Sequence, residues 1–178
     1  MNIYVVRHAQ AEHNILGTSN DVTSGVANLT QKGIQQAKGL AETIKHIPFD
    51  AIYTSEMART IQTANILCPG RALIKDARIN DIRTGMQGLP FTEFRKALKN
   101  SDDPWNTRFG DGESFEDEKV RTISFLEDLK KNNYTNVLIV THGGVANIIY
   151  GLSHNLSNEE TFNREIDNAS IFQVNLTN

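Results

Sequence analysis

Cysteine is almost absent from this 178-residue chain, which contains only Cys68. A single cysteine cannot form a disulfide framework or a zinc site built from several thiolates, and it suits a reducing compartment. The chain also lacks a run of about 18 apolar residues, the length needed to cross a bilayer, and a basic leader followed by an apolar segment. We therefore expect a cytoplasmic protein that is neither secreted nor inserted in a membrane.

An excess of positive charge is absent as well. The chain has 18 lysines and arginines against 21 aspartates and glutamates, a net charge of −3. Without a global basic field, neither nucleic acid nor an anionic membrane is an expected partner, so an anionic ligand would have to bind through local positive charge. The hydrophobic content of 39% is ordinary for a globular protein. We expect residues 1–178 to form one domain.

The first apolar run, residues 3–6, has the length and β-branched content of a buried strand, and it stops at Arg7 and His8. A cation and an imidazole at the end of a buried strand are costly unless something offsets their desolvation. A bound anion would offset it. The working hypothesis is that His8 is a nucleophile and Arg7 holds a phosphate. The alternative is that Arg7 reaches solvent and His8 only ends the strand.

A second strand is expected at residues 49–53, followed by Ser55, which can cap a helix over residues 56–67. Arg59 then lies in the first turn of that helix, where a cation opposes the helix dipole and a bound anion would reverse the sign of that effect. The alternative is a solvated surface arginine.

The clearest strand, residues 136–141, is continuously apolar, as strands of parallel sheets are. It ends at His142, Gly143 and Gly144, and an apolar helical run follows over residues 145–152. Glycine amides at the start of a helix form an anion site. Ligand sites of open α/β sheets lie beyond the carboxyl ends of the strands, so three strand ends of this kind indicate a phosphoryl site.

A metal is the alternative ligand for this site. His8, His13 and His142 have the right ligand type for zinc. The neighbouring arginines would repel a cation, so we expect neither a metal nor a cofactor.

The other elements follow from periodicity and turn residues. A loop is expected over residues 9–28, and Thr30 can cap a helix that ends before Pro48. In a helix over residues 115–131, an apolar stripe is expected to face the core. We also expect strands at 71–75 and 171–176 and a helix at 91–98. The apolar stripe of the helix over residues 115–131 consists of Val120, Ile123, Leu126 and Leu129, with Phe125 beside it.

Residues 76–115 are the hardest part of the chain to interpret, and residues 83–112 within them form a candidate lid or insertion. They contain several basic side chains near Trp105. Because long loops in compact domains are often functional, we expect a lid over the site. The alternative is a solvated insertion.

Four motifs together resemble the histidine phosphatase superfamily, whose members have the phosphoglycerate-mutase-like fold. The resemblance spans most of the chain and implies an α/β fold, a three-layer α/β/α sandwich with a mostly parallel sheet. It also implies that His8 becomes phosphorylated, that Arg7, Arg59 and His142 with the amide of Gly143 hold the phosphoryl group, and that Asn14 lines the pocket. The motifs are Val-Val-Arg7-His8-Ala-Gln-Ala-Glu-His-Asn14, Leu29-Thr-Gln-Lys-Gly33, Thr54-Ser55-Glu-Met-Ala-Arg59-Thr-Ile-Gln-Thr63 and Val140-Thr-His142-Gly-Gly144.

Two positions depart from the family pattern. Ala9 stands where the family usually has glycine, so we expect a right-handed or extended backbone there. The proton donor of the family is usually a glutamate. Here Asp81 occupies the matching place, and its shorter side chain must approach more closely or act through water. Glu113, in Gly110-Asp-Gly-Glu113-Ser, is the alternative acid.

The resemblance implies a metal-independent phosphatase that hydrolyses a small phosphorylated metabolite through a phosphohistidine on His8. The short chain favours this over a mutase, which typically has longer insertions. A mutase-type phosphotransferase, a protein phosphohistidine phosphatase and a non-catalytic phospholigand-binding protein remain alternatives, the last because the acid motif is altered.

Overall fold

A computed structural model describes residues 1–176 of the chain, and residues 177–178 of the expected domain lie outside the described part. Its centre is one five-stranded sheet in the order β3-β2-β4-β1-β5. Neighbouring strands are parallel except β5, which pairs antiparallel to β1. The strands are β1 Asn2–Arg7, β2 Ala51–Thr54, β3 Ile74–Lys75, β4 Asn136–Thr141 and β5 Ile171–Asn175.

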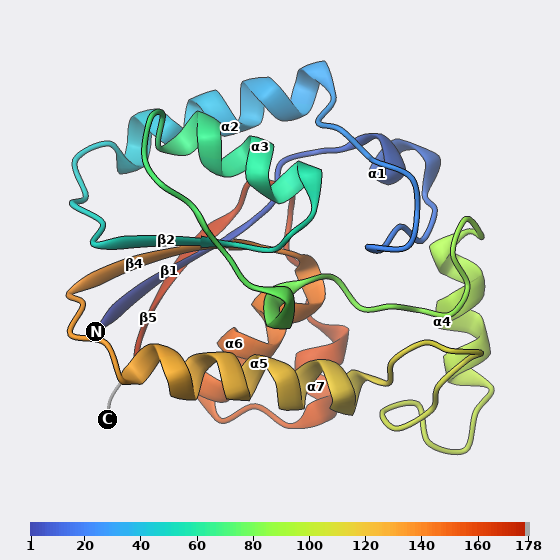
Figure 1. The fold of residues 1–178 in the computed structure, drawn as a ribbon. Helices are drawn as coiled ribbons and strands as arrows, with labels where there is room; N and C mark the ends of the chain where they lie inside the picture. Colours follow the sequence, from blue (N-terminus) through green and yellow to red (C-terminus); the bar gives the residue numbers. More distant parts are fainter. Residues whose placement is uncertain (177–178) are drawn as a thin grey trace.

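Helices cover both faces of this sheet, which confirms the predicted α/β sandwich. Figure 1 shows α2 and α3 above the strands and α5 and α6 below them, while α4 lies beyond the end of the sheet. The helices are α1 Glu12–Leu16, α2 Gln31–Ile44, α3 Ala58–Leu67, the 3₁₀ turn η1 Ala77–Ile79, α4 Phe91–Lys99, α5 Phe115–Lys130, α6 Gly143–His154 and α7 Asn158–Asn163. No helix among the described residues is long and apolar enough to span a bilayer.

The layers follow from the two-residue period of a strand. In β4, Val137 and Ile139 pack in the core beneath α5 and α6, and Leu138 and Val140 pack in the core beneath α2 and α3. All four side chains are fully buried. Both faces of the central strands are therefore apolar, as expected for parallel strands with helices on either side. This explains why the strand was recognisable in the sequence as an uninterrupted apolar run.

Several local expectations were wrong. The predicted loop over residues 9–28 contains the short helix α1, and α7 was not predicted. Ser55 does not cap α3, because the cap position is Met57 and no side chain bonds there. In α5, Val120 is 57% exposed although it belongs to the predicted apolar stripe, whereas Glu118 is completely buried. The caps at Thr30 and Ser114 form through hydrogen bonds from Gly33 and Asp117 amides.

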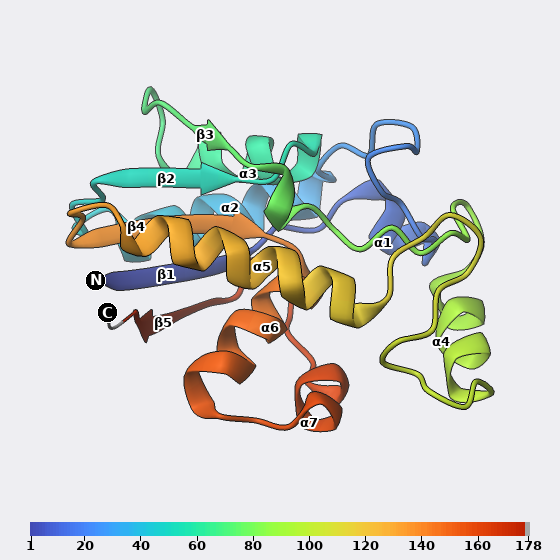
Figure 2. The same cartoon turned by 60° about the horizontal axis from the view of Figure 1, so that its bottom comes forward.

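The start of α2 packs directly on the backbone that follows β1 (Figure 2 shows α2 behind the sheet). The Thr30 amide donates to the Gln10 carbonyl at 2.9 Å. A Cβ added to Gly33 would lie 2.0 Å from the same carbonyl oxygen, whereas Gly39 in the same helix has open space around its Cα. Glycine at position 33 therefore permits a close approach that no other residue allows.

We predict that Gly33→Ala lowers the free energy of unfolding by roughly 1–3 kcal/mol, because overpacking outweighs the gain in helix propensity. The matched control, Gly39→Ala, should raise it by about 0.5–1 kcal/mol. Urea unfolding of the two variants measures both effects. Equal stabilisation by the two substitutions would show that the close contact with Gln10 is absent in solution.

Candidate active site

The parallel strands bring three predicted site segments to one edge of the sheet. β1 and β4 pair so that Arg7 lies opposite Thr141, and the His8 amide donates to the Thr141 carbonyl at 2.8 Å. The rings of His8 and His142 consequently lie with their centroids 5.2 Å apart. Ser55, at the end of β2, accompanies them. All three side chains are almost fully buried.

The tautomer of His8 is determined by a hydrogen bond to its neighbour. His8 Nδ1 lies 2.8 Å from the Ala9 carbonyl oxygen. Because a carbonyl only accepts, the neutral ring must carry its proton on Nδ1, which leaves the lone pair of Nε2 free. Burial, and secondarily the charge of Arg59, holds the pKa of His8 well below its ordinary value of 6.5. The imidazole of His8 is therefore neutral at neutral pH and has an available lone pair on Nε2.

The backbone around His8 is held from two sides. Among residues 1–176, the non-glycine residues with positive φ are Asn155 and Ala169, so Ala9 has an ordinary negative φ. The Ala9 amide donates to Thr63 Oγ1 at 3.1 Å. The expected right-handed or extended conformation at Ala9 is thus confirmed. From the C-terminal side, Asn168 Nδ2 donates to the His8 carbonyl at 3.0 Å. The Ala169 amide donates to the Arg7 carbonyl at 3.1 Å.

Four buried nitrogen atoms around His8 have no hydrogen-bond partner among the described residues: Arg7 Nε, His13 Nδ1, Arg59 Nε and His142 Nδ1. Buried polar groups left unpaired cost free energy, so such a cluster requires an explanation. Arg7 Nη1 donates to the Ile166 carbonyl, and His142 Nε2 lies 2.8 Å from Ser55 Oγ. Burial lowers the pKa of both arginines. A tetrahedral oxyanion would accept from the two guanidinium Nε–H groups and offset this desolvation.

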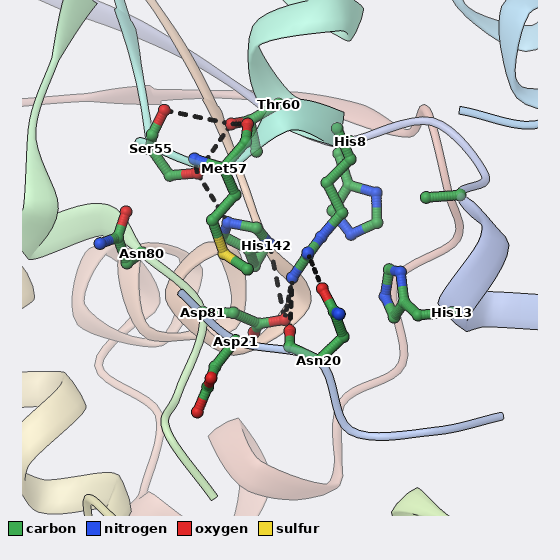
Figure 3. A network of polar contacts seen from close by, with 12 residues as sticks. His8, His13, Asn20, Asp21, Ser55, Met57, Thr60, Asn80, Asp81 and His142 are labelled. Carbon is green, nitrogen blue, oxygen red and sulfur yellow. Dashed lines mark hydrogen bonds and ion pairs between the residues drawn. The ribbon is translucent and has the colours of Figure 1, made fainter. Parts of the chain in front are cut away.

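Arg59 is only 1% exposed and lies beneath two residues of different loops. Its guanidinium donates to Asn20 Oδ1 at 2.8 Å, to the Asn20 carbonyl at 3.0 Å and to Asp81 Oδ2 at 2.9 Å. The same Asp81 oxygen lies 3.5 Å from His142 Nδ1. Figure 3 shows Asn20, Asp81 and His142 gathered beneath His8. Arg59, expected in the first turn of a helix, is the second residue of α3.

The two candidate acids occupy different environments. Asp81 lines the cavity next to His8, and its side chain is 25% exposed. Glu113 does not line that cavity. Its carboxylate pairs with Arg121 at 2.8 Å and accepts the Arg83 amide at 3.0 Å. Asp81 therefore shares the cavity with His8, whereas Glu113 binds the backbone amide of Arg83, two residues after Asp81.

The cavity has a volume of about 440 Å³, within the range of small-molecule sites. Asn14, His13 and Gly143, predicted from the sequence, line it near Arg7 and His8. His13 lies 5.4 Å from His8 between ring centroids, and its pKa is lowered to about 3, first by burial and then by Arg59 and Arg7. The opposite wall includes Phe91, Arg95 and Trp105, which belong to the segment over residues 83–112 that was expected to cover the site, together with Phe115 and Phe162, which were not predicted.

Two further residues were also missed. Asn20 belongs to the predicted loop, and nothing in the sequence links it to Arg59, 39 positions away. Glu118 lies in α5, and neither of its carboxylate oxygens has a hydrogen-bond partner among residues 1–176. It packs on the start of α6, where a Cβ added to Gly144 would lie 2.6 Å from its Oε2. Burial, with smaller contributions from Asp81 and Glu113 and against the charge of Arg121, raises the pKa of Glu118 to about 8.

Comparisons with known proteins agree with this geometry. A family model described as "Histidine phosphatase superfamily (branch 1)" matches residues 3–178. A Hydrogenobacter thermophilus protein assigned as phosphoserine phosphatase 2 is 32% identical, over 98% of this chain and 89% of its own length. The adenosylcobalamin/alpha-ribazole phosphatase of Salmonella typhimurium is 30% identical over 84% of this chain and 77% of its own length. The crystal structure of the alpha-ribazole phosphatase from Shigella flexneri superposes with a TM-score of 0.86 at 22% identity, covering 99% and 91%.

We predict that Glu118 makes stability depend on pH. Its pKa is about 8 in the folded protein against an ordinary 4.5, so between these values the folded state holds a proton that the unfolded state has released. The free energy of unfolding must then fall as pH rises from 4.5 to 8, by at most about 1.4 kcal/mol per pH unit. Because glutamine does not ionise, Glu118→Gln should not lose unfolding free energy in this pH range through this position.

Urea unfolding from pH 5 to 9 should show the stability of Glu118→Gln rising relative to wild type as pH increases. Glu127, on the exposed face of the same helix, provides the matched control. Glu127→Gln should change stability by less than about 0.5 kcal/mol at every pH. Parallel pH curves for wild type and Glu118→Gln would contradict the prediction.

Proposed function

Because the chain belongs to the histidine phosphatase superfamily, we propose that it hydrolyses small phosphate monoesters through a phosphohistidine formed on His8. The observation that carries this proposal is the His8 ring, which is neutral and has its proton on Nδ1. Such a ring directs an available lone pair on Nε2 into a site surrounded by unpaired N–H donors. These groups suit a reaction in which a nucleophile attacks a phosphoryl group.

In the proposed first step, His8 Nε2 attacks phosphorus in line with the leaving oxygen. Arg7, Arg59 and His142, whose Nε, Nε and Nδ1 atoms have no partner among residues 1–176, hold the equatorial oxygens together with the Gly143 amide at the start of α6. Phosphoryl transfer depends mainly on positioning and on electrostatic stabilisation of these oxygens. Asn14, which accepts the Ala11 amide at 2.9 Å, is proposed to shape the same pocket.

Asp81 is the proposed proton donor to the leaving alkoxide. In the free protein its Oδ2 lies 2.9 Å from Arg59 Nη2. A bound phosphate would compete for Arg59, and its own negative charge favours a protonated acid. Asp81 is thus proposed to take up its proton as substrate binds. Once the alcohol has left, the same carboxylate activates the water that hydrolyses the phosphohistidine.

The substrate is proposed to be a small phosphorylated metabolite. In support, two relatives carry the names phosphoserine phosphatase and adenosylcobalamin/alpha-ribazole phosphatase. Thr84, Phe91, Arg95 and Trp105, all within residues 83–112, line the cavity, and we propose that this segment covers bound substrate. A cytoplasmic location is proposed from the single cysteine alone.

We predict that His8→Ala lowers kcat by at least about 10⁴-fold, because it removes the nucleophile on which the other groups act. Incubation of wild type with labelled substrate, followed by rapid quenching, should trap an acid-labile, base-stable phosphoryl group on His8. His46→Ala, which changes an exposed histidine, should retain full activity. An acid-stable phosphoserine or phosphothreonine in the quenched protein would refute the mechanism.

We predict that Asp81→Asn slows hydrolysis of alkyl phosphates by about 10²–10⁴-fold, the usual contribution of a general acid. It should slow hydrolysis of p-nitrophenyl phosphate much less, because that leaving group needs little protonation. Glu113→Gln should affect the two substrate types equally, since Glu113 lies outside the cavity and binds Arg121. The reverse pattern for the two variants would assign the proton to Glu113.

A further inference from the structure

The far wall of the cavity carries chemistry that phosphoryl transfer does not use. It consists of aromatic side chains from α4, the following loop, the start of α5 and α7, with one guanidinium among them. We call Trp105, Phe115 and Phe162, with Arg95, the aromatic wall. All four residues line the same cavity as His8. Figure 1 shows that α4 and the loop behind it lie well away from the strand ends that carry His8 and His142.

The rings of the wall pack on one another as a continuous surface. Phe115 lies 4.5 Å from Phe162 in an edge-to-face arrangement and 5.8 Å from Trp105 in a stacked one, between ring centroids. Each of the three side chains is only partly buried. Trp105 and Phe162 also line a second cavity of about 470 Å³. Two of the three rings therefore border open space besides the cavity that contains His8.

Arg95 forms neither a hydrogen bond nor an ion pair in the hydrogen-bond and salt-bridge networks of residues 1–176, and its guanidinium carbon lies 4.7 Å from the centroid of Phe162. In contrast, Arg78, Arg108 and Arg121 each pair with a carboxylate. A planar cation on an aromatic face, with its N–H donors free, is suited to a second flat group. Arg95 thus extends the flat surface of the wall and adds donors at its edge.

We propose, on the basis of the phosphatase function proposed above, that the preferred leaving group carries a planar ring that packs against the aromatic wall beside Arg95. The phosphoryl group would lie at His8 and the ring at the wall. A cavity of about 440 Å³ is large for a leaving group of three carbons and has the size of sites that enclose ring-bearing ligands. Aromatic rings prefer offset or edge-on partners, which this wall supplies.

The test compares 2-phenylethyl phosphate with ethyl phosphate. Both release a primary alkoxide, so the chemical step makes similar demands on His8 and the acid, and the substrates differ in the ring. Wild type should have a kcat/KM roughly 10–100-fold higher for 2-phenylethyl phosphate, from burial of the ring. Phe162→Ala and Arg95→Met should each reduce this ratio toward one. Leu152→Ala, an exposed apolar position on α6 that lines neither cavity, should leave the ratio unchanged.

The outcomes separate this inference from the phosphatase function. Equal kcat/KM values for the two esters, or a ratio that Phe162→Ala and Arg95→Met both leave intact, would overturn the aromatic-wall assignment while leaving the phosphatase proposal standing. Absence of hydrolysis of either ester, together with no phosphohistidine on His8, would overturn the phosphatase proposal itself. Because Phe162→Ala removes packing against Phe115 and could impair folding, Arg95→Met, which keeps an unbranched apolar stem and removes the guanidinium, provides the independent measurement.

Discussion

The parallel pairing of β1 with β4 is the constraint on which the site depends. It places Arg7 opposite Thr141, so the two residues that follow, His8 and His142, leave the sheet side by side. A slip of one residue would turn the apolar side chains of a strand to the opposite face. Because both faces of β4 are packed beneath helices, such a slip is strongly disfavoured. The core thus determines the position of two imidazoles whose own interactions could not do so.

The same burial makes the site costly to the folded state and effective toward an anion. His8, Arg59 and His142 are removed from solvent, and Arg7 Nε, Arg59 Nε and His142 Nδ1 have no hydrogen-bond partner within the part of the chain that the structure describes. In water these groups would be solvated, and in an apolar interior each unpaired donor lowers stability. Yet a low dielectric strengthens their attraction for a phosphoryl group, and donors already in place need little reorganisation. Stability lost in the free protein is therefore recovered in the complex.

Most of the fold and the centre of the site could be predicted from the sequence because both depend on short-range patterns. An apolar run identified β4, and polar residues at its end identified His142. The failures depend on contacts between distant segments. The five-residue helix α1 is too short to be stable by propensity alone. Glu118 occupies a position that a charged residue normally exposes, and its burial follows from how α5 packs on α6. Asn20 reaches Arg59 only through the course of a loop.

Asn168 and Ala169 hold the His8 backbone from a segment 160 positions further along the chain. His8 precedes this segment in the chain, so it is synthesised before the residues that hold it. Contacts of such high sequence separation form late, because closure of the intervening chain must come first. A nascent or prematurely terminated chain therefore contains His8 without the means to keep it in place. The backbone of the predicted nucleophile is therefore fixed only once the segment containing Asn168 and Ala169 has folded against it.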